Sequence, residues 1–469
     1  MRLEEDSFGS IKVPSDAYYG PFTQRSMDNF HISGTYFQKE FIHAYAILKR
    51  SAAIANERLG ALDPRISRAI VRACDEIING KFGDQFRVDV FQAGTGTSTN
   101  MNLNEVIANR ALEILGHKRG NYRVVNPNDH VNMSQSTNDT FQSAAHIAAC
   151  LMIKKRLVPA LEKYQKSIEK KSGEFSGIVK SGRTHLMDAV PITLGQEFSG
   201  YTIEQEMKEI REASDDLLHL SVGGTAVGTG LNTYPKYKSL FFSELNRYTK
   251  SRFVPVKNNF AMTQNITTIA ETSSKLRNLC LKLIKTSNDL RLMSSGPYAG
   301  LNEIALPAVQ AGSSIMPGKV NPSMPEMLTM VCFSVMGNDS TIAIAAQGGQ
   351  FELNIFVPVA AYKLLESIGI LSKGIEVFTE RCISGIRPNR AQLRGYFERS
   401  AEVATALSPA LGYERVAMLV KEAERRDLSI RDLVLEKRLI GKKELDRILD
   451  PARLTRPDLP FSKAGKKRA

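Results

Sequence analysis

The sequence lacks the closely spaced cysteines and histidines that metal sites and disulfide frameworks require. Its 469 residues include 5 cysteines, an odd number, and 7 histidines, and both kinds are scattered along the chain. No Cys-x-x-Cys or His-x-x-x-His pattern occurs, so neither a zinc site nor a disulfide-stabilised scaffold is indicated. We expect the cysteines to be buried thiols, and we expect no metal and no cofactor.

Long apolar runs are also missing. Each one is interrupted within about ten residues, whereas a membrane span requires roughly 20. The first residues, Met1 to Ser7, are polar and acidic, unlike the apolar stretch of a signal peptide. We therefore expect no membrane contact and a cytoplasmic location.

No repeat of fixed period and no Ser/Gly-rich or Pro-rich linker divides the chain. Its length favours two or three domains, and its 42% apolar and 24% charged residues are typical of a globular protein. The net charge of +13 would suit a nucleic-acid surface. The basic residues concentrate in residues 436–443 and 462–469, however, without an aromatic nucleic-acid motif. A charged surface with a solvated basic tail is the favoured interpretation, and we expect no nucleic acid as a partner.

Helical periodicity is abundant. Residues 256–295 contain neither Gly nor Pro, and apolar or small residues recur there every three or four positions, as in helices packed nearly parallel. These positions are Ile266, Ile269, Ser273, Leu276, Cys280, Leu283, Ser287 and Leu290. Further helices are predicted over residues 141–171, interrupted by Pro159, from about Pro325 to Gly348, and after Pro358. Strand-like alternation is limited to short pieces such as residues 87–90, so the central third should be an all-α bundle.

The predicted helices are too long for one chain to cover. A helix of about 40 residues is about 60 Å long, and a monomer would leave much of its apolar face in water. We therefore expect the chain to form an oligomer through this bundle.

Four segments are denser in hydroxyl, amide and glycine residues than ordinary connectors: residues 94–105, 126–139, 182–191 and 312–322. The first two run into predicted helices, the first of them over residues 106–115. Side-chain oxygens and free backbone N–H groups at a helix N-terminus form a favourable site for a carboxylate or phosphate. Ordinary helix capping is the alternative, but one residue would suffice for it, and each segment supplies four or more.

The third and fourth segments have simpler alternatives. His185 in the third is either a catalytic residue or a packed, hydrogen-bonded histidine. The fourth carries two glycines and two prolines, which suits a loop that opens and closes. After it, Ser323 and Glu326 have the spacing of a capping box, which gives Glu326 a structural explanation. A fifth, glycine-rich segment, residues 223–230, fits neither a P-loop nor a dinucleotide fingerprint, and a tight turn between helices is the better interpretation.

Five residues of the fourth segment form the pattern Gly-Ser-x-x-Met-x-x-Lys-x-Asn, namely Gly312, Ser313, Met316, Lys319 and Asn321. With this signature, the sequence resembles the aspartase/fumarase superfamily. Further similarity lies in residues 6–9, 97–102, 136–139, 182–185 and 195–198, and it covers almost the whole chain. The set points to the branch of class II fumarases and aspartases, not to argininosuccinate or adenylosuccinate lyases.

The resemblance implies a mainly α subunit of three domains. These are a mainly helical N-terminal domain (residues 1–135), a central long-helix bundle (residues 136–391) and a small C-terminal helical domain with a basic tail (residues 392–469). Four central domains would form a twenty-helix core, so the expected partners are further copies of the chain in a homotetramer. Each active site would be shared by three subunits and bind a small dicarboxylate.

The resemblance also implies roles for individual residues. Ser313 resembles the general base on a mobile loop, His185 is the second catalytic residue, and Glu326 resembles its partner. The expected substrate clamp, which also includes His185, consists of Thr97, Ser136, Thr137, Asn138, Thr184, Ser314, Lys319 and Asn321. Hydroxyl and N–H donors in such a clamp stabilise the doubly charged aci-carboxylate formed when a proton next to a carboxylate is removed.

Two positions depart from the family pattern. Gln142 stands where the family usually has a proline, which affects how the helix there begins. Asn126 stands where fumarases often have a histidine, in an accessory dicarboxylate site formed with Asn128 and Asp129.

Local similarities divide between two reactions. Residues 115–122, 136–138, 262–265, 300–304, 310–312 and 449–457 resemble aspartases, and fumarases usually have serine where Thr137 stands. Residues 184–189 and 351–356 resemble fumarases. We favour elimination of ammonia from aspartate, with hydration of fumarate as the alternative. A non-enzymatic structural member is a further alternative, and the intact set of Ser313, His185, Lys319 and Asn321 argues against it.

Overall fold

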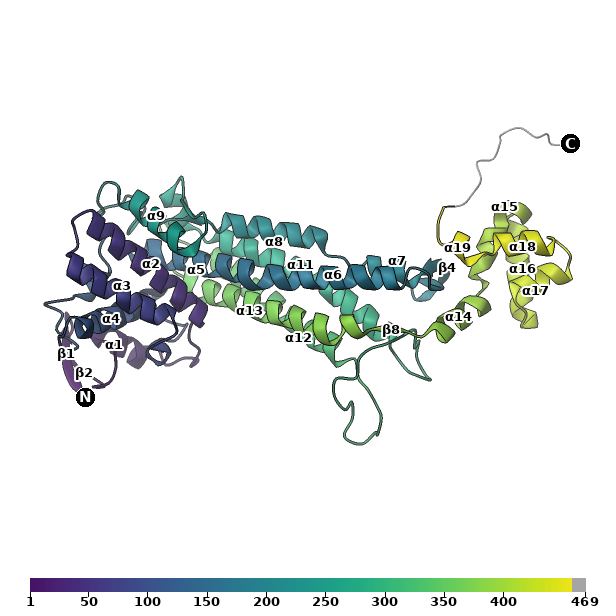
Figure 1. Ribbon diagram of the computed structural model, residues 1–469, viewed down its shortest axis with the longest axis horizontal. Helices are drawn as coiled ribbons and strands as arrows, with labels where there is room; N and C mark the ends of the chain where they lie inside the picture. Colours follow the sequence, from purple (N-terminus) through teal and green to yellow (C-terminus); the bar gives the residue numbers. More distant parts are fainter. Residues whose placement is uncertain (458–469) are drawn as a thin grey trace. The chain divides into compact units, whose positions relative to one another are not determined.

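The computed structural model describes residues 1–457 and is mainly α-helical, as the sequence predicts (Figure 1). The sheets found among these residues have two strands each. All five cysteines are buried and free, which confirms the prediction of buried thiols. The basic tail expected over residues 462–469 lies outside the described residues.

Contacts divide the chain into two compact units. Unit 1 comprises residues 1–161, 205–281 and 330–374, and unit 2 comprises residues 162–204, 282–329 and those from 375 onward. Several long helices begin in one unit and end in the other. The three-domain division predicted above stays a prediction.

Unit 1 is a bundle of helices with two small sheets. Its helices include α1 (Pro21–Asn29), α2 (Lys39–Arg58), α3 (Pro64–Ile78), α4 (Thr97–Ile114), α5 (Thr137–Met152), α8 (Glu204–Asp216), α9 (Tyr237–Thr249), α10 (Asn259–Gln264) and the start of α11 (Thr267–Met293). Strands β1 (Arg2–Asp6) and β2 (Gly9–Val13) pair antiparallel, and β5 (His219–Leu220) and β6 (Val254–Pro255) pair parallel. Helix α2 packs against α3, α5 and α9 (Figure 1).

Unit 2 combines helix segments with two antiparallel sheets. It contains most of α6 (Val158–Glu174), α7 (Leu194–Ser199), the C-terminal part of α11, the start of α12 (Ser323–Ala346) and the end of α13 (Val357–Arg381). Its sheets pair β3 (Val179–Thr184) with β4 (Met187–Thr193) and β7 (Ile304–Ala305) with β8 (Arg387–Pro388). Its later helices are α14 (Arg390–Arg399), the 3₁₀ turn η6 (Ala401–Leu407), α15 (Ser408–Leu411), α16 (Tyr413–Arg426), α17 (Ile430–Glu436), α18 (Lys442–Ile448) and α19 (Pro451–Leu454).

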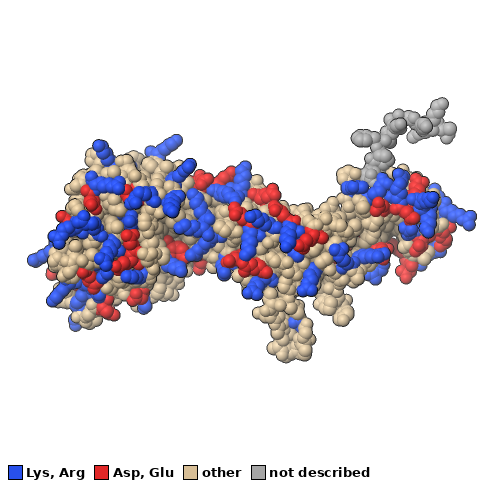
Figure 2. All heavy atoms as spheres, in the orientation of Figure 1, with Lys and Arg blue, Asp and Glu red and all other residues tan. Residues whose placement is uncertain are grey.

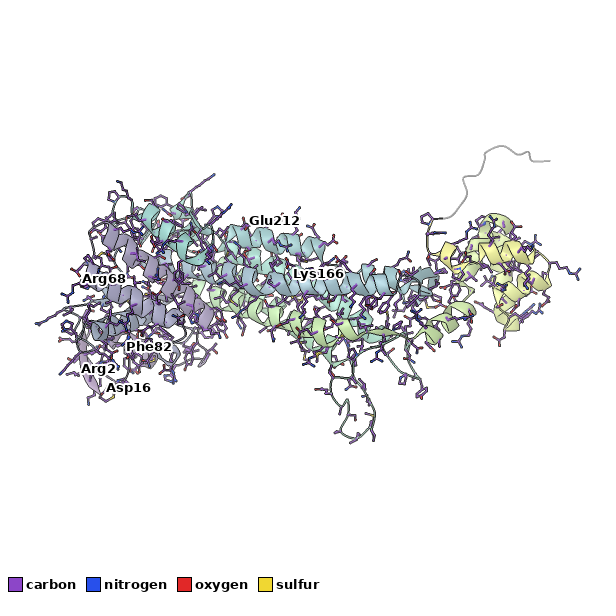
Figure 3. All side chains as sticks on the ribbon, viewed as in Figure 1. Arg2, Asp16, Arg68, Phe82, Lys166 and Glu212 are labelled. Atoms are coloured by element: carbon purple, nitrogen blue, oxygen red, sulfur yellow. The ribbon has the colours of Figure 1, made fainter. Side chains whose placement is uncertain are left out.

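The cores of both units are mainly apolar, and many charged side chains lie outside them. Arg68 on α3 and Lys166 on α6 are exposed and point into solvent (Figure 3). In the core of unit 1, the rings of Phe41 on α2 and Phe141 on α5 lie 4.8 Å apart between centroids. Such interlocking apolar side chains provide most of the stability of a bundle.

Helix α11 confirms the predicted periodicity and corrects its extent. Each of the eight stripe positions is at most 1% exposed. Residues 256–266 do not belong to the helix, because α10 ends at Asn265 in extended backbone with φ −125° and ψ 144°. Gln142 of α5 donates to the carbonyl of Asn265 over 3.0 Å and so ties down this break. The 27 residues of α11 give a length of about 40 Å, not the expected 60 Å.

The helix predicted over residues 141–171 is continuous but widened at one point. Helix α5 passes through the π-helical turn η4 (Ile153–Leu157) into α6. Pro159 lies directly after this turn, and its ring has no N–H to donate and crowds the carbonyl one turn back. A π-turn opens the backbone at that place, so the helix continues beyond the proline.

The strand expected over residues 87–90 is wrong. Among the described residues only Asp89 of this piece pairs, in an isolated bridge with Tyr36. The Asp89 carboxylate accepts N–H groups of Ser33, Gly34 and Phe91 over 2.7 to 2.9 Å. The carboxylate therefore organises a turn, and the backbone is not free to form a ladder.

Helix α12 begins and ends close to the predicted bounds, but its surface differs from that of the other helices. Met330, Phe333 and Ile344 on it are 62%, 59% and 65% exposed. By length and composition alone, α12 is apolar enough to cross a membrane. The sequence analysis expected no such segment. The same properties are found in the core helix of a soluble protein.

Candidate active site

The first predicted clamp segment folds differently from the expectation. Helix α4 begins at Thr97, nine residues before the predicted start at Val106, so most of the polar segment is helical. Before it, Thr95 and Gly96 have φ values of 60° and 86°. A Cβ on Gly96 would lie 2.1 Å from the ring of Phe141, so only glycine fits where this turn meets α5. Thr97 itself is half-buried at the first position of the helix.

The second clamp segment ends in a complete capping box, which was the alternative to a binding role for this segment. The Ser136 hydroxyl accepts the N–H of Asn138 over 3.3 Å, and Asp139 accepts the N–H of Ser136 over 2.9 Å. Thr137 and Asn138 follow in the first turn of α5. Capping uses only the acceptor side of the Ser136 oxygen, so its proton is available to a ligand.

The two clamp helices are joined by one direct hydrogen bond. The side-chain amide of Asn100, one turn into α4, donates to the hydroxyl oxygen of Thr137 over 3.0 Å. The structure therefore brings the N-terminal turns of α4 and α5 together in unit 1. A helix N-terminus favours an anion, although the Thr99 N–H of α4 already donates to the side-chain oxygen of Gln92 over 2.9 Å.

The glycine-rich segment 223–230 is hydrogen-bonded to the first turn of α5. The Asp139 carboxylate accepts the N–H groups of Gly223 and Thr225, each over 2.9 Å. Asn138 donates its amide to the carbonyl of Ala226 over 2.8 Å. Complete burial raises the pKa of Asp139 to about 6, although these backbone donors oppose the change. The segment is a turn that binds a protein carboxylate, in agreement with the interpretation as a turn.

The side chain of Asn126 has a structural task. Its oxygen accepts the N–H groups of Asn128 and Asp129 over 2.8 and 3.1 Å and caps the π-helical turn η3 (Pro127–Val131). Its acceptor atom is thus already used within the chain.

In unit 2, Thr184 and His185 lie at the tip of the β3–β4 hairpin. Thr184 pairs with Met187, so His185 and Leu186 form a two-residue loop, with φ values of 55° and 62°. Such a tight loop requires two residues of positive φ and is usually made by Asn and Gly. A leucine there is unfavourable, and Leu186 is 72% exposed, so no packing compensates it. Backbone strain of this kind is concentrated at functional sites.

A buried charge cluster anchors this hairpin, and the sequence analysis missed it. Glu303 is 0% exposed, and its carboxylate oxygens lie 2.7 Å from Arg183 and 2.8 Å from Lys180. Lys180 also contacts Glu197 over 2.8 Å. The signal in the sequence is weak, because Glu303 is separated from its partners by more than a hundred residues of chain.

The predicted base lies on the loop that joins β7 to α12. The Ser313 hydroxyl oxygen accepts the backbone N–H groups of Ile315 and Met316 over 3.2 and 3.0 Å. The loop closes on itself at its base, where Asn321 donates to the carbonyl of Gly312 over 2.6 Å. Ser314 and Lys319 are exposed, and within residues 1–457 Lys319 pairs with no carboxylate, so its ammonium is available to an anion.

Glu326 lies in the first turn of α12, but the predicted capping box is wrong. The helix already includes Ser323, whose hydroxyl points back to the carbonyl of Asn321 at 3.5 Å. Within the described part of one chain, no hydrogen bond or ion pair connects Glu326 with His185. The roles assigned to these residues and to the clamp stay predictions.

The face of the molecule drawn in Figure 2 shows how its charges are distributed. On the face drawn in Figure 2, basic and acidic side chains are interspersed over each unit. A nucleic-acid surface is usually a coherent basic patch, so this view gives it no support.

Comparison with known proteins gives consistent results along the whole chain. A family model described as lyase matches residues 9–337, and one described as fumarase C C-terminus matches residues 403–456. An aspartate ammonia-lyase of Helicobacter pylori is 46% identical over 461 residues, which cover 97% of this chain and 98% of the relative. A class II fumarate hydratase of the same organism is 45% identical over 459 residues, which cover 97% of this chain and 99% of the relative. The crystal structure of a fumarate lyase:delta crystallin from Brucella melitensis aligns with a TM-score of 0.94 and 42% identity, over 97% of this chain and 100% of that one.

Proposed function

The chain belongs to the lyase family that includes aspartate ammonia-lyases and class II fumarate hydratases, and on this premise we propose that it eliminates ammonia from L-aspartate to give fumarate. The reaction is a reversible anti elimination. A base removes a proton from the carbon next to one carboxylate, the electron pair moves into that carboxylate, and its return expels ammonia from the neighbouring carbon.

The observation that carries the proposal is the environment of Ser313. A serine hydroxyl has a high pKa and is a weak base, so it requires stabilisation of its alkoxide. Two backbone N–H groups, of Ile315 and Met316, already point at its oxygen. Donors arranged in this way favour the charged form of an oxygen and cost no reorganisation during reaction. Ser313 is therefore the general base of the proposed mechanism.

The hydroxyl groups of the clamp receive the developing charge. Thr97, Ser136, Thr137 and Ser314 donate to the aci-carboxylate, whose two negative charges need several preorganised donors. Lys319 and Asn321 bind the second carboxylate and so fix the substrate for anti elimination. Asn321 exchanges its bond with the Gly312 carbonyl for one with the substrate when the loop closes.

His185 and Glu326 serve the leaving group. Departing ammonia needs no protonation beyond that of the substrate ammonium, whereas departing hydroxide benefits from an acid. A histidine paired with a carboxylate handles protons near neutral pH in either case. No hydrogen bond or ion pair connects the two residues within residues 1–457 of one chain. The proposed site, as the family resemblance implies, combines residues of three subunits.

The proposed enzyme is a homotetramer in the cytoplasm, with the small dicarboxylate as its ligand. The exposed apolar face of α12, formed by Met330, Phe333 and Ile344, supports burial against further copies of the chain. In this assembly residues 136–391 form the central bundle, flanked by residues 1–135 and 392–469.

Hydration of fumarate to L-malate is the second candidate. A class II fumarate hydratase is nearly as similar to the chain as an aspartate ammonia-lyase, and residues 184–189 and 351–356 favour it. Thr137 favours the ammonia-lyase, since a second serine is usual in fumarases at that position.

One assay separates the candidates. Purified protein receives L-aspartate and L-malate in parallel in the same buffer, and the ultraviolet absorbance of fumarate is followed. We expect fumarate from aspartate together with an equal amount of ammonium. Fumarate from malate alone would identify a hydratase, and no product from either substrate would overturn both assignments.

A further inference from the structure

A buried lysine of unit 1 is connected to the clamp residue Thr137 through two asparagines. No step described so far uses this lysine. Lys49 on α2 is 0% exposed. Its ammonium donates to the side-chain oxygen of Asn132 over 2.8 Å, and no other hydrogen bond of this group occurs among residues 1–457. Asn132 precedes α5, and its partners on α4 are Asn100 and Asn104.

The amide of Asn132 is oriented by these partners. Its oxygen accepts from Lys49 and, over 3.2 Å each, from the side-chain N–H groups of Asn100 and Asn104. Its nitrogen donates to the carbonyl of Gln135 over 3.2 Å. An amide can turn its oxygen or its nitrogen to a neighbour, but an ammonium group only donates. In its protonated form, Lys49 therefore forces Asn132 to present its oxygen.

The direction of this hydrogen bond determines the next ones. Because Asn132 presents an oxygen, Asn100 must present its NH2 group, and the second N–H of that group donates to the hydroxyl of Thr137 over 3.0 Å. The oxygen of Asn100 accepts from the Tyr45 hydroxyl over 2.7 Å, which is consistent with this orientation. A hydroxyl that accepts on one side has its proton directed elsewhere. Among the described residues the Thr137 hydroxyl donates to no acceptor, so its proton is available to a ligand.

We infer that Lys49 is a positioning residue. It sets the donor-to-acceptor direction of the hydrogen bonds that run from Lys49 through Asn132 and Asn100 to Thr137, so that the Thr137 hydroxyl donates to a substrate carboxylate. Lys49 does not contact the substrate. The inference rests on the proposed function, in which Thr137 belongs to the clamp.

Stability alone does not account for Lys49. A buried cation that is bonded to one neutral amide and lies 5.3 Å from the centre of the Tyr45 ring loses more hydration than it regains. The carboxylate that acts on Lys49 is that of Asp139, which is already held by three backbone N–H groups. Burial lowers the pKa of Lys49 to about 7, against the attraction of Asp139. An apolar side chain of similar length would stabilise the fold better, so a role in orientation explains why a lysine stands here.

A double-mutant cycle tests the inference. Lys49→Met, Thr137→Val and the double variant are compared with the unchanged protein for affinity to succinate, a dicarboxylate without a leaving group. Each single change should weaken binding about tenfold, the value of one hydrogen bond to a charged group. If Lys49 acts through Thr137, adding the second substitution to either single variant should weaken succinate binding by less than about a further twofold. Additive losses would overturn the inference.

Further variants separate orientation from charge and from folding. Lys49→Gln keeps a donor without the charge, so its succinate affinity should lie between those of the unchanged protein and Lys49→Met. Affinity as weak as that of Lys49→Met would overturn the inference. Lys171→Met, which removes another buried lysine, is the matched control and should leave succinate affinity unchanged. Melting temperatures should stay at or above that of the unchanged protein for Lys49→Met, and a large decrease would indicate a merely structural role.

Failure of the proposed function has a different signature. An unchanged protein that forms no fumarate from aspartate or malate would overturn that function, whatever the binding data show. An active enzyme with additive effects of Lys49 and Thr137 would overturn only the role of Lys49.

Discussion

Arg183 lies 2.7 Å from Glu303, a carboxylate that is fully buried in unit 2. Arg183 belongs to the hairpin that carries Thr184 and His185, and Glu303 directly precedes β7 and the Ser313 loop. Lys180, three residues earlier in β3, contacts the second oxygen of the same carboxylate over 2.8 Å. A single side chain thus connects two of the segments predicted to act on the substrate.

Glu303→Gln should therefore damage both stability and activity. Without the carboxylate, Arg183 loses its ion pair with Glu303 and Lys180 keeps its pair with Glu197. Breaking the buried pair costs about 3 kcal/mol or more of unfolding free energy. We expect a lower melting temperature and a lower kcat in the aspartate assay. Glu197→Gln is the control, since Glu197 is partly exposed, pairs with Lys180 and accepts a hydrogen bond from Tyr201 over 3.3 Å, and its effect should be small. A Glu303→Gln variant with the melting temperature of the unchanged protein would contradict the anchoring role.

Ser313→Ala should separate chemistry from binding. The change removes the proposed base and leaves the backbone donors of Ile315 and Met316 in place. We expect kcat to fall by about 10²–10⁴-fold, while the affinity for succinate and the oligomeric state stay the same. Ser176→Ala, at an exposed serine of unit 2, should be silent. Turnover near the normal rate in Ser313→Ala would remove Ser313 from the mechanism.

Regular periodicity made the long helices predictable. The stripe from Ile266 to Leu290 is buried along its length, because a repeat of three and four residues defines one helix face whatever packs against it. The start of α4 was missed for the opposite reason. Its Thr and Asn residues favour turns locally, and the helix forms because distant partners satisfy them, such as Tyr45 for Asn100 and the carbonyl of Gln85 for Asn102.

Site residues that belong to one short motif were predictable from the sequence. Isolated charged residues that are buried in the fold were not. Ser313, Lys319 and Asn321 share one short loop, so the signature identifies them together. Lys49 and Glu303 are isolated charges in otherwise ordinary stretches, and they find partners 83 and 120 residues away along the chain. No local pattern reports such a pairing, since it depends on the tertiary fold.

The carboxyl group of Glu402 should make stability depend on pH. Burial raises its pKa from 4.5 to about 7, and the charge of Asp188 adds to the change. Between pH 4.5 and 7 the folded state therefore binds more protons than the unfolded one, and the unfolding free energy falls as pH rises. The glutamine in Glu402→Gln cannot ionise. The variant should therefore have a higher melting temperature than the unchanged protein at pH 8 and the same melting temperature at pH 4.5. Glu398→Gln, at an exposed position of α14, should show no such difference, and equal melting curves for Glu402→Gln at pH 8 would contradict the shift.

Thr137→Ser tests the position that favours aspartate over malate. Serine keeps the hydroxyl that accepts from Asn100 and removes one methyl group beside the substrate. If this residue discriminates between leaving groups, the ratio of kcat/KM for aspartate to that for malate should fall by about tenfold, as expected for one methyl group in a binding site. Thr249→Ser on α9 is the control, because Thr249 does not belong to the clamp. An unchanged ratio would place the discrimination elsewhere.

Phe333→Glu tests whether the apolar face of α12 is buried in an assembly. Phe333 is 59% exposed in the single chain and lies near Met330 on the same helix face, where a charge is harmless in a monomer but costly in an interface. We expect the variant to sediment as a smaller species and to lose turnover, because a site shared between subunits requires the oligomer. Met418→Glu, at an exposed apolar residue of α16, should keep both size and activity. A monomeric active protein would overturn the shared site, and recovery of the unchanged protein with membranes would assign α12 to a bilayer instead.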